Sequence, residues 1–152
     1  MKSTILIVIL LCGVIAYAKS DELPQKVNEG FKKKFPNTSI ISWYEEENIF
    51  KVEFEFASDY MTASFSIAGL WLETSKAIEN SEIPKTVESS IQKKYAGSEV
   101  TYAEFVENNL GLKFFKVYGV TSDANYIIDI SQDGKILKEV LSKFDTDEYD
   151  DE

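Results

Sequence analysis

The segment LPQKVNEGFKKKF, Leu23–Phe35, returns sixty residues later as IPKTVESSIQKKY, Ile83–Tyr95. Apolar residues recur every four positions in each copy, which is the spacing of one face of an amphipathic helix. A proline follows the first apolar residue in both copies, at the start of a helix, where its missing N–H costs nothing. The sequence therefore predicts two equivalent units, each beginning with a helix.

The segments that follow the two helices are also related, at an offset of sixty-five. Phe50-Lys51-Val52 returns as Phe115-Lys116-Val117, and FSIAGLWLE (65–73) aligns with ISQDGKILK (130–138). This second alignment places Gly69 on Gly134. Glycine at this point is typical of a tight turn that needs a positive φ angle.

Between these turns the apolar period falls to two, most clearly in residues 50–56, where apolar and charged residues alternate. Such alternation is typical of a half-buried strand. Each unit is therefore predicted to contain one helix followed by four antiparallel strands. The expected strands are 40–45, 50–56, 60–67 and 70–74, and then 100–106, 112–120, 126–130 and 135–141.

A unit of about sixty residues buries little surface by itself, and it would expose sheet edges that invite mispairing. Joining the two units edge to edge removes both problems. We therefore expect an α+β fold with one continuous antiparallel sheet of about eight strands. Both helices should lie on one face of this sheet, and the other face should be open to solvent or to a partner.

Both ends of the chain lie outside this repeat. Residues 1–18 are typical of an export signal, with Lys2, an apolar run and small residues at Ala16 and Ala18. The alternative, a retained membrane helix, is disfavoured because the apolar run is shorter than the roughly 20 residues that span a bilayer. The acidic segment 145–152 should be disordered. The predicted organisation is a signal peptide (1–18), unit one (19–80), unit two (81–144) and this tail.

Composition excludes several classes of function. The 152-residue chain has a net charge of −10 and contains no histidine and no arginine, so nucleic acid is a poor partner. Its single cysteine, Cys12, lies in the signal segment, so a disulfide or cysteine metal site is not expected. We expect no cofactor, no metal site and no catalytic centre. Glu45–Glu47 is interpreted as a hairpin turn rather than an acid–base pair, and Asp133-Gly134 as a turn rather than a calcium loop.

The order of these motifs resembles the PepSY-like, beta-lactamase-inhibitor-like family of exported bacterial proteins. The resemblance rests on the Leu/Ile-Pro pair before each helix, Phe35-Pro36 at its end, Trp43, and a Gly-x-Trp/Ile-Leu turn. Unit two departs from the pattern at Tyr95-Ala96 and Ala103. The resemblance implies the fold of the beta-lactamase inhibitor protein, export to the periplasm and a binding role. It does not imply that a beta-lactamase is inhibited.

The open face of the sheet is the candidate site. If the apolar residues of 50–56 face the helices, Lys51, Glu53 and Glu55 face outward. By the same alternation, an inward Leu72 predicts an outward Trp71, a residue type that anchors interfaces. The alternative is that Trp71 covers a neighbouring strand or the junction between the units. Three tyrosines are expected to share the open face: Tyr44, Tyr102 and Tyr118.

These observations predict an exported, non-enzymatic binding module, periplasmic or secreted, that acts through its open face in the manner of an inhibitor. The partner should be a protein or peptide of the cell envelope, and neither nucleic acid nor, after signal cleavage, a membrane. The protein should be a monomer. Two alternatives remain: an envelope hydrolase that uses paired carboxylates, and a structural protein that binds an envelope polymer.

Overall fold

A computed structural model describes residues 22–144, so the predicted signal peptide and the acidic tail, residues 145–152, lie outside the described residues. The described chain contains one helix and four strands, twice in succession. Unit one consists of α1 (Gln25–Lys34), β1 (Ile40–Glu46), β2 (Ile49–Phe56), β3 (Asp59–Ser66) and β4 (Trp71–Ile78). After a short 3₁₀ turn, unit two consists of α2 (Lys85–Lys94), β5 (Glu99–Asn108), β6 (Lys113–Val120), β7 (Ala124–Ser131) and β8 (Ile136–Lys143).

The eight strands form one sheet in the order of the chain, and each strand is antiparallel to the next. The two units are joined where β4 pairs with β5, from Glu73 opposite Asn108 to Ile78 opposite Ala103. The predicted fold class and the edge-to-edge joining of the units are therefore confirmed.

Both helices pack on the same face of this sheet. Residues paired directly across neighbouring strands lie on the same face of a sheet. Val52 in β2 pairs with Ala63, and Ala63 pairs with Thr74 in β4. The pairing of β4 with β5 continues this face into unit two. On that face α1 buries Val27 and Phe31, and α2 buries the equivalent residues Val87 and Ile91. We call this the helix face and the opposite one the inner face.

The helix face carries two separate hydrophobic cores rather than one. The first lies under α1 and is mostly phenylalanine and valine. The second lies under α2, where the Tyr126 ring stacks on Tyr95 at 4.3 Å between centroids. The buried residues of each core belong to one unit, and Ile78 at the end of β4 also packs against the second core. The shared sheet therefore connects the two cores.

The two glycine turns have the predicted backbone conformation, with φ values of 78° at Gly69 and 85° at Gly134. They also bring the turns against the helices. A Cβ atom on Gly69 would overlap the backbone oxygen of Lys26 in α1. In unit two, a Cβ on Gly134 would meet Thr86 and Ser90 of α2. Each helix therefore rests directly on the turn between the third and fourth strands of its unit.

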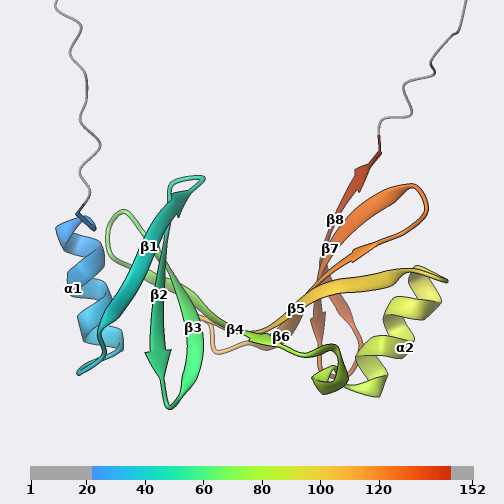
Figure 1. Cartoon of the computed structure of the whole chain (residues 1–152), viewed down its shortest axis with the longest axis horizontal. Coiled ribbons are helices and arrows are strands. Elements are labelled where there is room, and N and C mark those ends of the chain that lie inside the picture. Colours follow the sequence, from blue (N-terminus) through green and yellow to red (C-terminus); the bar gives the residue numbers. More distant parts are fainter. Residues whose placement is uncertain (1–21, 145–152) are drawn as a thin grey trace, which may run out of the picture.

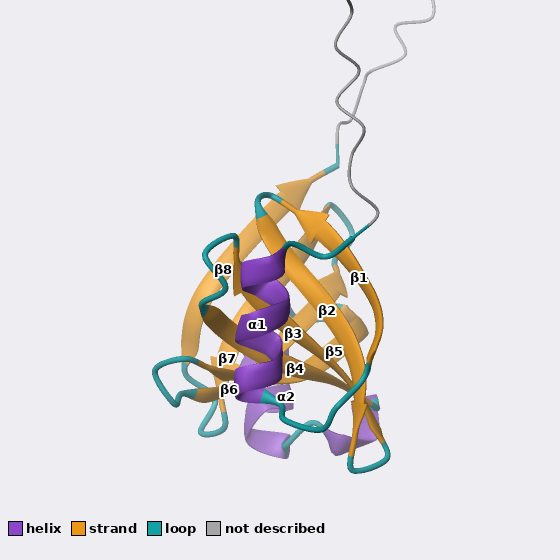
Figure 2. Cartoon of the chain, turned by 90° about the vertical axis from the view of Figure 1, so that its left-hand side faces the viewer, coloured by secondary structure: helices purple, strands orange, loops and turns teal. Residues whose placement is uncertain are grey.

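The sheet is strongly twisted, as expected for a continuous antiparallel sheet. In Figure 1 its two halves rise on either side of β4 to β6, so that the sheet resembles a V with α1 and α2 on the outside. Figure 2, seen from the α1 side, shows this helix lying across the outer face of the near half. The inner face is consequently concave and has no helix over it. Within residues 22–144, neither helix has the length and apolar character needed to cross a bilayer.

Candidate functional site

The concave inner face contains two depressions, of about 460 and 370 Å³. The larger reaches from the turn between β1 and β2 to β7 and β8, and the smaller lies nearer β1, β3 and β5. They are continuous, because both are lined by Glu46, Lys51, Glu73, Lys116 and Tyr118. We call the combined depression the trough. Its lining comes from both units, so only the assembled sheet forms it.

A salt-bridge triad of Lys51, Glu73 and Lys116 lies at the centre of the trough. The Glu73 Oε1 atom is 3.0 Å from Lys116 Nζ and 3.8 Å from Lys51 Nζ, and all three side chains are largely buried. Lys51 Nζ also donates a hydrogen bond to Ser64 at 3.0 Å. Lys51 and Lys116 occupy equivalent positions in the repeat, so one carboxylate connects the two units across the inner face.

The corresponding positions in unit two carry different charges. Where unit one has Ser64 and Glu73 beside its lysine, unit two has Asp129 and Lys138, which pair with each other across β7 and β8. Burial raises the pKa of the Asp129 carboxyl, while the positive charges of Lys116 and Lys138 oppose this rise. These equivalent positions in the two units therefore differ in charge although the backbone repeats.

A cluster of three tyrosines forms the other end of the trough. Tyr102 on β5 lies beside Tyr118 on β6, with ring centroids 5.4 Å apart. Tyr44 on β1 lines the same depression, and Tyr44 and Tyr102 remain 46% and 44% exposed. The side chain of Glu104 accepts hydrogen bonds from Tyr102 at 3.3 Å and from buried Ser75 at 3.0 Å. We call Tyr44, Tyr102, Tyr118 and Glu104 the tyrosine end.

The charge of Glu104 affects all three phenols. Burial raises the pKa of Tyr118, and the Glu104 carboxylate raises it further. Burial followed by Glu104 also raises the pKa of Tyr102. For Tyr44, burial is again the main cause of the raised pKa, followed by Glu53, Glu46 and Glu104. The three rings are therefore neutral at physiological pH.

We expect these phenols to ionise only above the usual tyrosine pKa of about 10. Because the folded state keeps protons that the unfolded state releases, the free energy of unfolding should fall as the pH rises above about 10. Glu104→Gln should lower the pKa of Tyr102 and Tyr118, since it removes a negative charge that opposes the phenolate. The ultraviolet absorbance of phenolate, followed against pH in both proteins, measures this. Identical titration curves would contradict the role of Glu104.

The three tyrosines predicted from alternation thus lie together on the inner face, but the predicted outward orientation of Trp71 is wrong. A β-bulge pairs Ser64 with Glu73 and the next residue, Phe65, with Trp71, so that Leu72 is skipped and Trp71 turns to the helix face. Its ring packs against the first core, and its Nε1 donates to Thr74 at 2.9 Å. Lys34 Nζ lies over the ring, 3.5 Å from the centroid.

Trp71 is therefore a half-buried residue at the edge of the first core, which is neither the outward anchor nor the cover of the junction between the units. Among the other sequence expectations, Glu45 and Glu46 belong to β1, and the turn is formed by Glu47 and Asn48, both with positive φ. Phe56 lies at the end of β2 and is 51% exposed, so it contributes little to the core.

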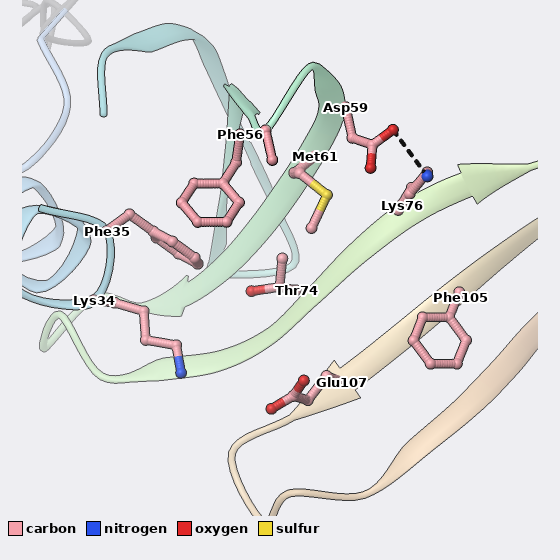
Figure 3. A pocket seen from close by; sticks show the side chains of 10 residues that line it. Lys34, Phe35, Phe56, Asp59, Met61, Thr74, Lys76, Phe105 and Glu107 are labelled. Atoms are coloured by element: carbon pink, nitrogen blue, oxygen red, sulfur yellow. Dashed lines mark ion pairs between the residues drawn. The ribbon is translucent and has the colours of Figure 1, made fainter. Parts of the chain in front are cut away.

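A further pocket of about 410 Å³ lies on the helix face at the junction of the units. Figure 3 shows the apolar residues around this pocket, Phe35, Phe56, Met61 and Phe105. The charged residues that line it are Lys34, Asp59, Lys76 and Glu107. Its charged groups are occupied within the chain. Lys76 Nζ is 2.9 Å from Asp59, Glu107 pairs with Lys113 at 3.6 Å, and Lys34 is the cation over the tryptophan ring. In the trough, by contrast, the Glu104 carboxylate has hydroxyl partners rather than a lysine partner.

Sequence reasoning missed the triad. Alternation placed Lys51 on the inner face, but Glu73 and Lys116 were not recognised. The sequence did contain a signal for Lys116, because Lys116 aligns with Lys51 in the repeat. No group of three histidine, cysteine or acidic side chains in the described part of the chain is placed to hold a metal ion.

Taken together, the fold and the trough define a class of two-unit, helix-and-sheet proteins with an uncovered concave face. The model of one protein family, described as "Putative beta-lactamase-inhibitor-like, PepSY-like", matches residues 15–59 and 48–138, which is most of the chain. The chain belongs to this family.

Solved structures show the same fold. A BLIP-like protein from Bacteroides fragilis has a TM-score of 0.63 and 20% identity, over 83% of this chain and 92% of that protein. A DUF2874 family protein from Bacteroides uniformis has a TM-score of 0.65 and 18% identity, over 79% and 90%. A protein from Bacteroides eggerthii described as "putative periplasmic" has a TM-score of 0.64 and 15% identity, over 79% and 89%. At these identities the similarity establishes the fold. No curated protein matches the chain.

Proposed function

We propose that this protein is an exported, non-enzymatic binding module of the cell envelope that holds a protein or peptide in its trough. One observation carries the proposal: the trough spans both units, has no helix over it and presents half-exposed tyrosines beside carboxylates. Tyrosine is enriched at protein interfaces because it combines a large apolar ring with a hydrogen-bonding group. The family description and the BLIP-like relative support a binding role, and the relative described as periplasmic supports the location.

Site-specific photo-cross-linking tests this proposal. A benzophenone amino acid replaces Tyr44 in the trough or, as a control, Lys33 on the exposed side of α1. Both proteins are irradiated in an extract of the cells that encode this chain. We expect a covalent adduct from position 44 and none from position 33, and protease treatment should degrade the captured partner.

Two outcomes would contradict the proposal. Adducts from position 33 alone would place the interface on the helix face. A captured partner that resists protease would favour the alternative in which the protein binds an envelope polymer.

A further inference from the structure

We infer that the tyrosine end of the trough is a binding site for a cationic side chain, a lysine or arginine presented by the partner. The inference rests on the proposed function and specifies the chemistry of the partner. It follows from the geometry of the rings, from the charges around them and from the hydrogen bonding of Glu104.

The rings supply the first part of the site. The rings of Tyr102 and Tyr118 are tilted by 52° to one another, and Tyr44 on β1 lines the same depression. A cation is attracted to the face of an aromatic ring within about 6 Å of its centroid, and aromatic groups of this kind surround ammonium ligands. Because the phenols are neutral and partly exposed, their rings are available to such a ligand.

The charges around the rings select the sign of the ligand. The lining of the trough includes six carboxylates and three lysines, so its described residues have an excess of negative charge. Lys51 and Lys116 are both bound to Glu73, at the centre of the trough. A phosphate or carboxylate at the tyrosine end would instead face Glu46, Glu53 and Glu104.

Glu104 is the residue that would pair with the cation. Its side chain accepts hydrogen bonds from the hydroxyl groups of Tyr102 and Ser75, and no lysine in residues 22–144 forms an ion pair with it. A carboxylate accepts several hydrogen bonds, and those from a charged donor are about twice as strong as neutral ones. Glu53 is similarly held by the Ser42 hydroxyl. The cross-strand neighbour of Glu104 is Lys116, whose ammonium group is bound to Glu73. An incoming ammonium or guanidinium group would therefore give Glu104 an ion-pair partner of its own.

A peptide titration tests the inference. The probes are acetyl-Gly-Lys-Gly-amide and the same peptide with arginine or glutamate at the centre, added to isotope-labelled protein and followed by NMR. We expect saturable shifts at Tyr102, Glu104 and Tyr118 with the lysine and arginine peptides, weakening as salt is added. The glutamate peptide should produce none. Shifts that are equal for all three peptides, or that lie elsewhere, would overturn the inference.

Two variants locate the site. Glu104→Gln should weaken lysine-peptide binding about tenfold, and Tyr102→Ala at least about threefold. The matched controls are Glu88→Gln on α2 and Tyr60→Ala, an exposed tyrosine that does not line the trough, and both should bind as the unmodified protein does. If Glu104→Gln and Tyr102→Ala bound the lysine peptide as tightly as the unmodified protein does, the inference would be overturned.

The two proposals fail separately. If the lysine and arginine peptides do not bind while position 44 still captures a protein, the cation site is wrong and the binding role stands. If position 44 captures nothing and the peptides do not bind, both are wrong.

Discussion

Replacing Phe54 by alanine will lower the free energy of unfolding by about 3–5 kcal/mol, a large part of the roughly 5–15 kcal/mol that stabilises a typical domain. Phe54 is fully buried at the centre of the first core. Its ring lies 4.5 Å from Phe35 and 5.1 Å, edge-on, from Phe31, measured between centroids. Alanine would remove these contacts and leave a cavity between α1 and β2 that the rigid sheet cannot close.

Urea unfolding measures this loss and also tests whether the units unfold together. Trp43 and Trp71 both pack against the first core, so tryptophan fluorescence reports on unit one, whereas circular dichroism reports on the whole sheet. Because β4 and β5 are paired, we expect the two signals to change at the same urea concentration, in the variant as in the unmodified protein. A second transition seen only by circular dichroism would show that the units unfold independently.

Phe56→Ala is the matched control for this experiment. It changes the same residue type in the same strand, two positions further on, where the side chain is 51% exposed. We expect a loss of less than about 1 kcal/mol, since a partly exposed ring leaves little cavity. A similar loss in both variants would mean that burial in the first core does not determine the effect.

The architecture could be predicted because the residues that become buried are apolar and recur at regular spacings in the sequence. Val27 and Phe31 in the first helix, and Val87 and Ile91 in the second, recur at the spacing of a helix face, and all four are buried. In β2 the apolar residues instead occupy every second position, which is the spacing of one face of a strand. These patterns depend on local geometry, so they can be recognised without knowing how the strands are arranged.

The orientation of Trp71 could not be predicted from alternation because a β-bulge interrupts it. The sequence nevertheless held a signal in the repeat. Trp71 aligns with Ile136, and β7 and β8 have the same bulge, which pairs Asp129 with Lys138 and Ile130 with Ile136 while skipping Leu137. Ile136 packs against the second core, as Trp71 packs against the first. An apolar residue at this point in both units indicates a core position.

The trough depends on longer-range geometry. The contact between Lys51 and Glu73 depends on strand register, which places these residues on either side of Ser64 on the inner face. The pairing of β4 with β5 then brings Lys116 of unit two beside Glu73 of unit one. The sequence therefore predicted that Lys51 and the three tyrosines lie on the inner face, but it did not predict the contacts of Lys51 with Glu73 and of Glu73 with Lys116.

Expressed alone, unit one (residues 22–80) will fail to form a stable monomer. Removing unit two leaves β4 as an exposed edge from Glu73 to Ile78, although Thr74 and Ser75 on this strand are buried in the intact protein. Glu73 would lose its contact with Lys116, and Ser75 its hydrogen bond to Glu104. A chain of about sixty residues buries only roughly 60% of its unfolded surface, so little stability remains to offset these losses.

Circular dichroism and sedimentation of the isolated unit test this expectation. We expect either an unfolded chain or a dimer whose β4 edges pair with each other, because an unpaired strand edge is a template for another strand. Adding residues 81–144 as a separate chain should suppress such a dimer and increase the strand signal, since β5 satisfies the backbone groups of β4 with the correct register. A unit that remains monomeric and unfolds cooperatively would show that each core is stable without the shared sheet. The paired β4 and β5 would then serve only to align the two halves of the trough.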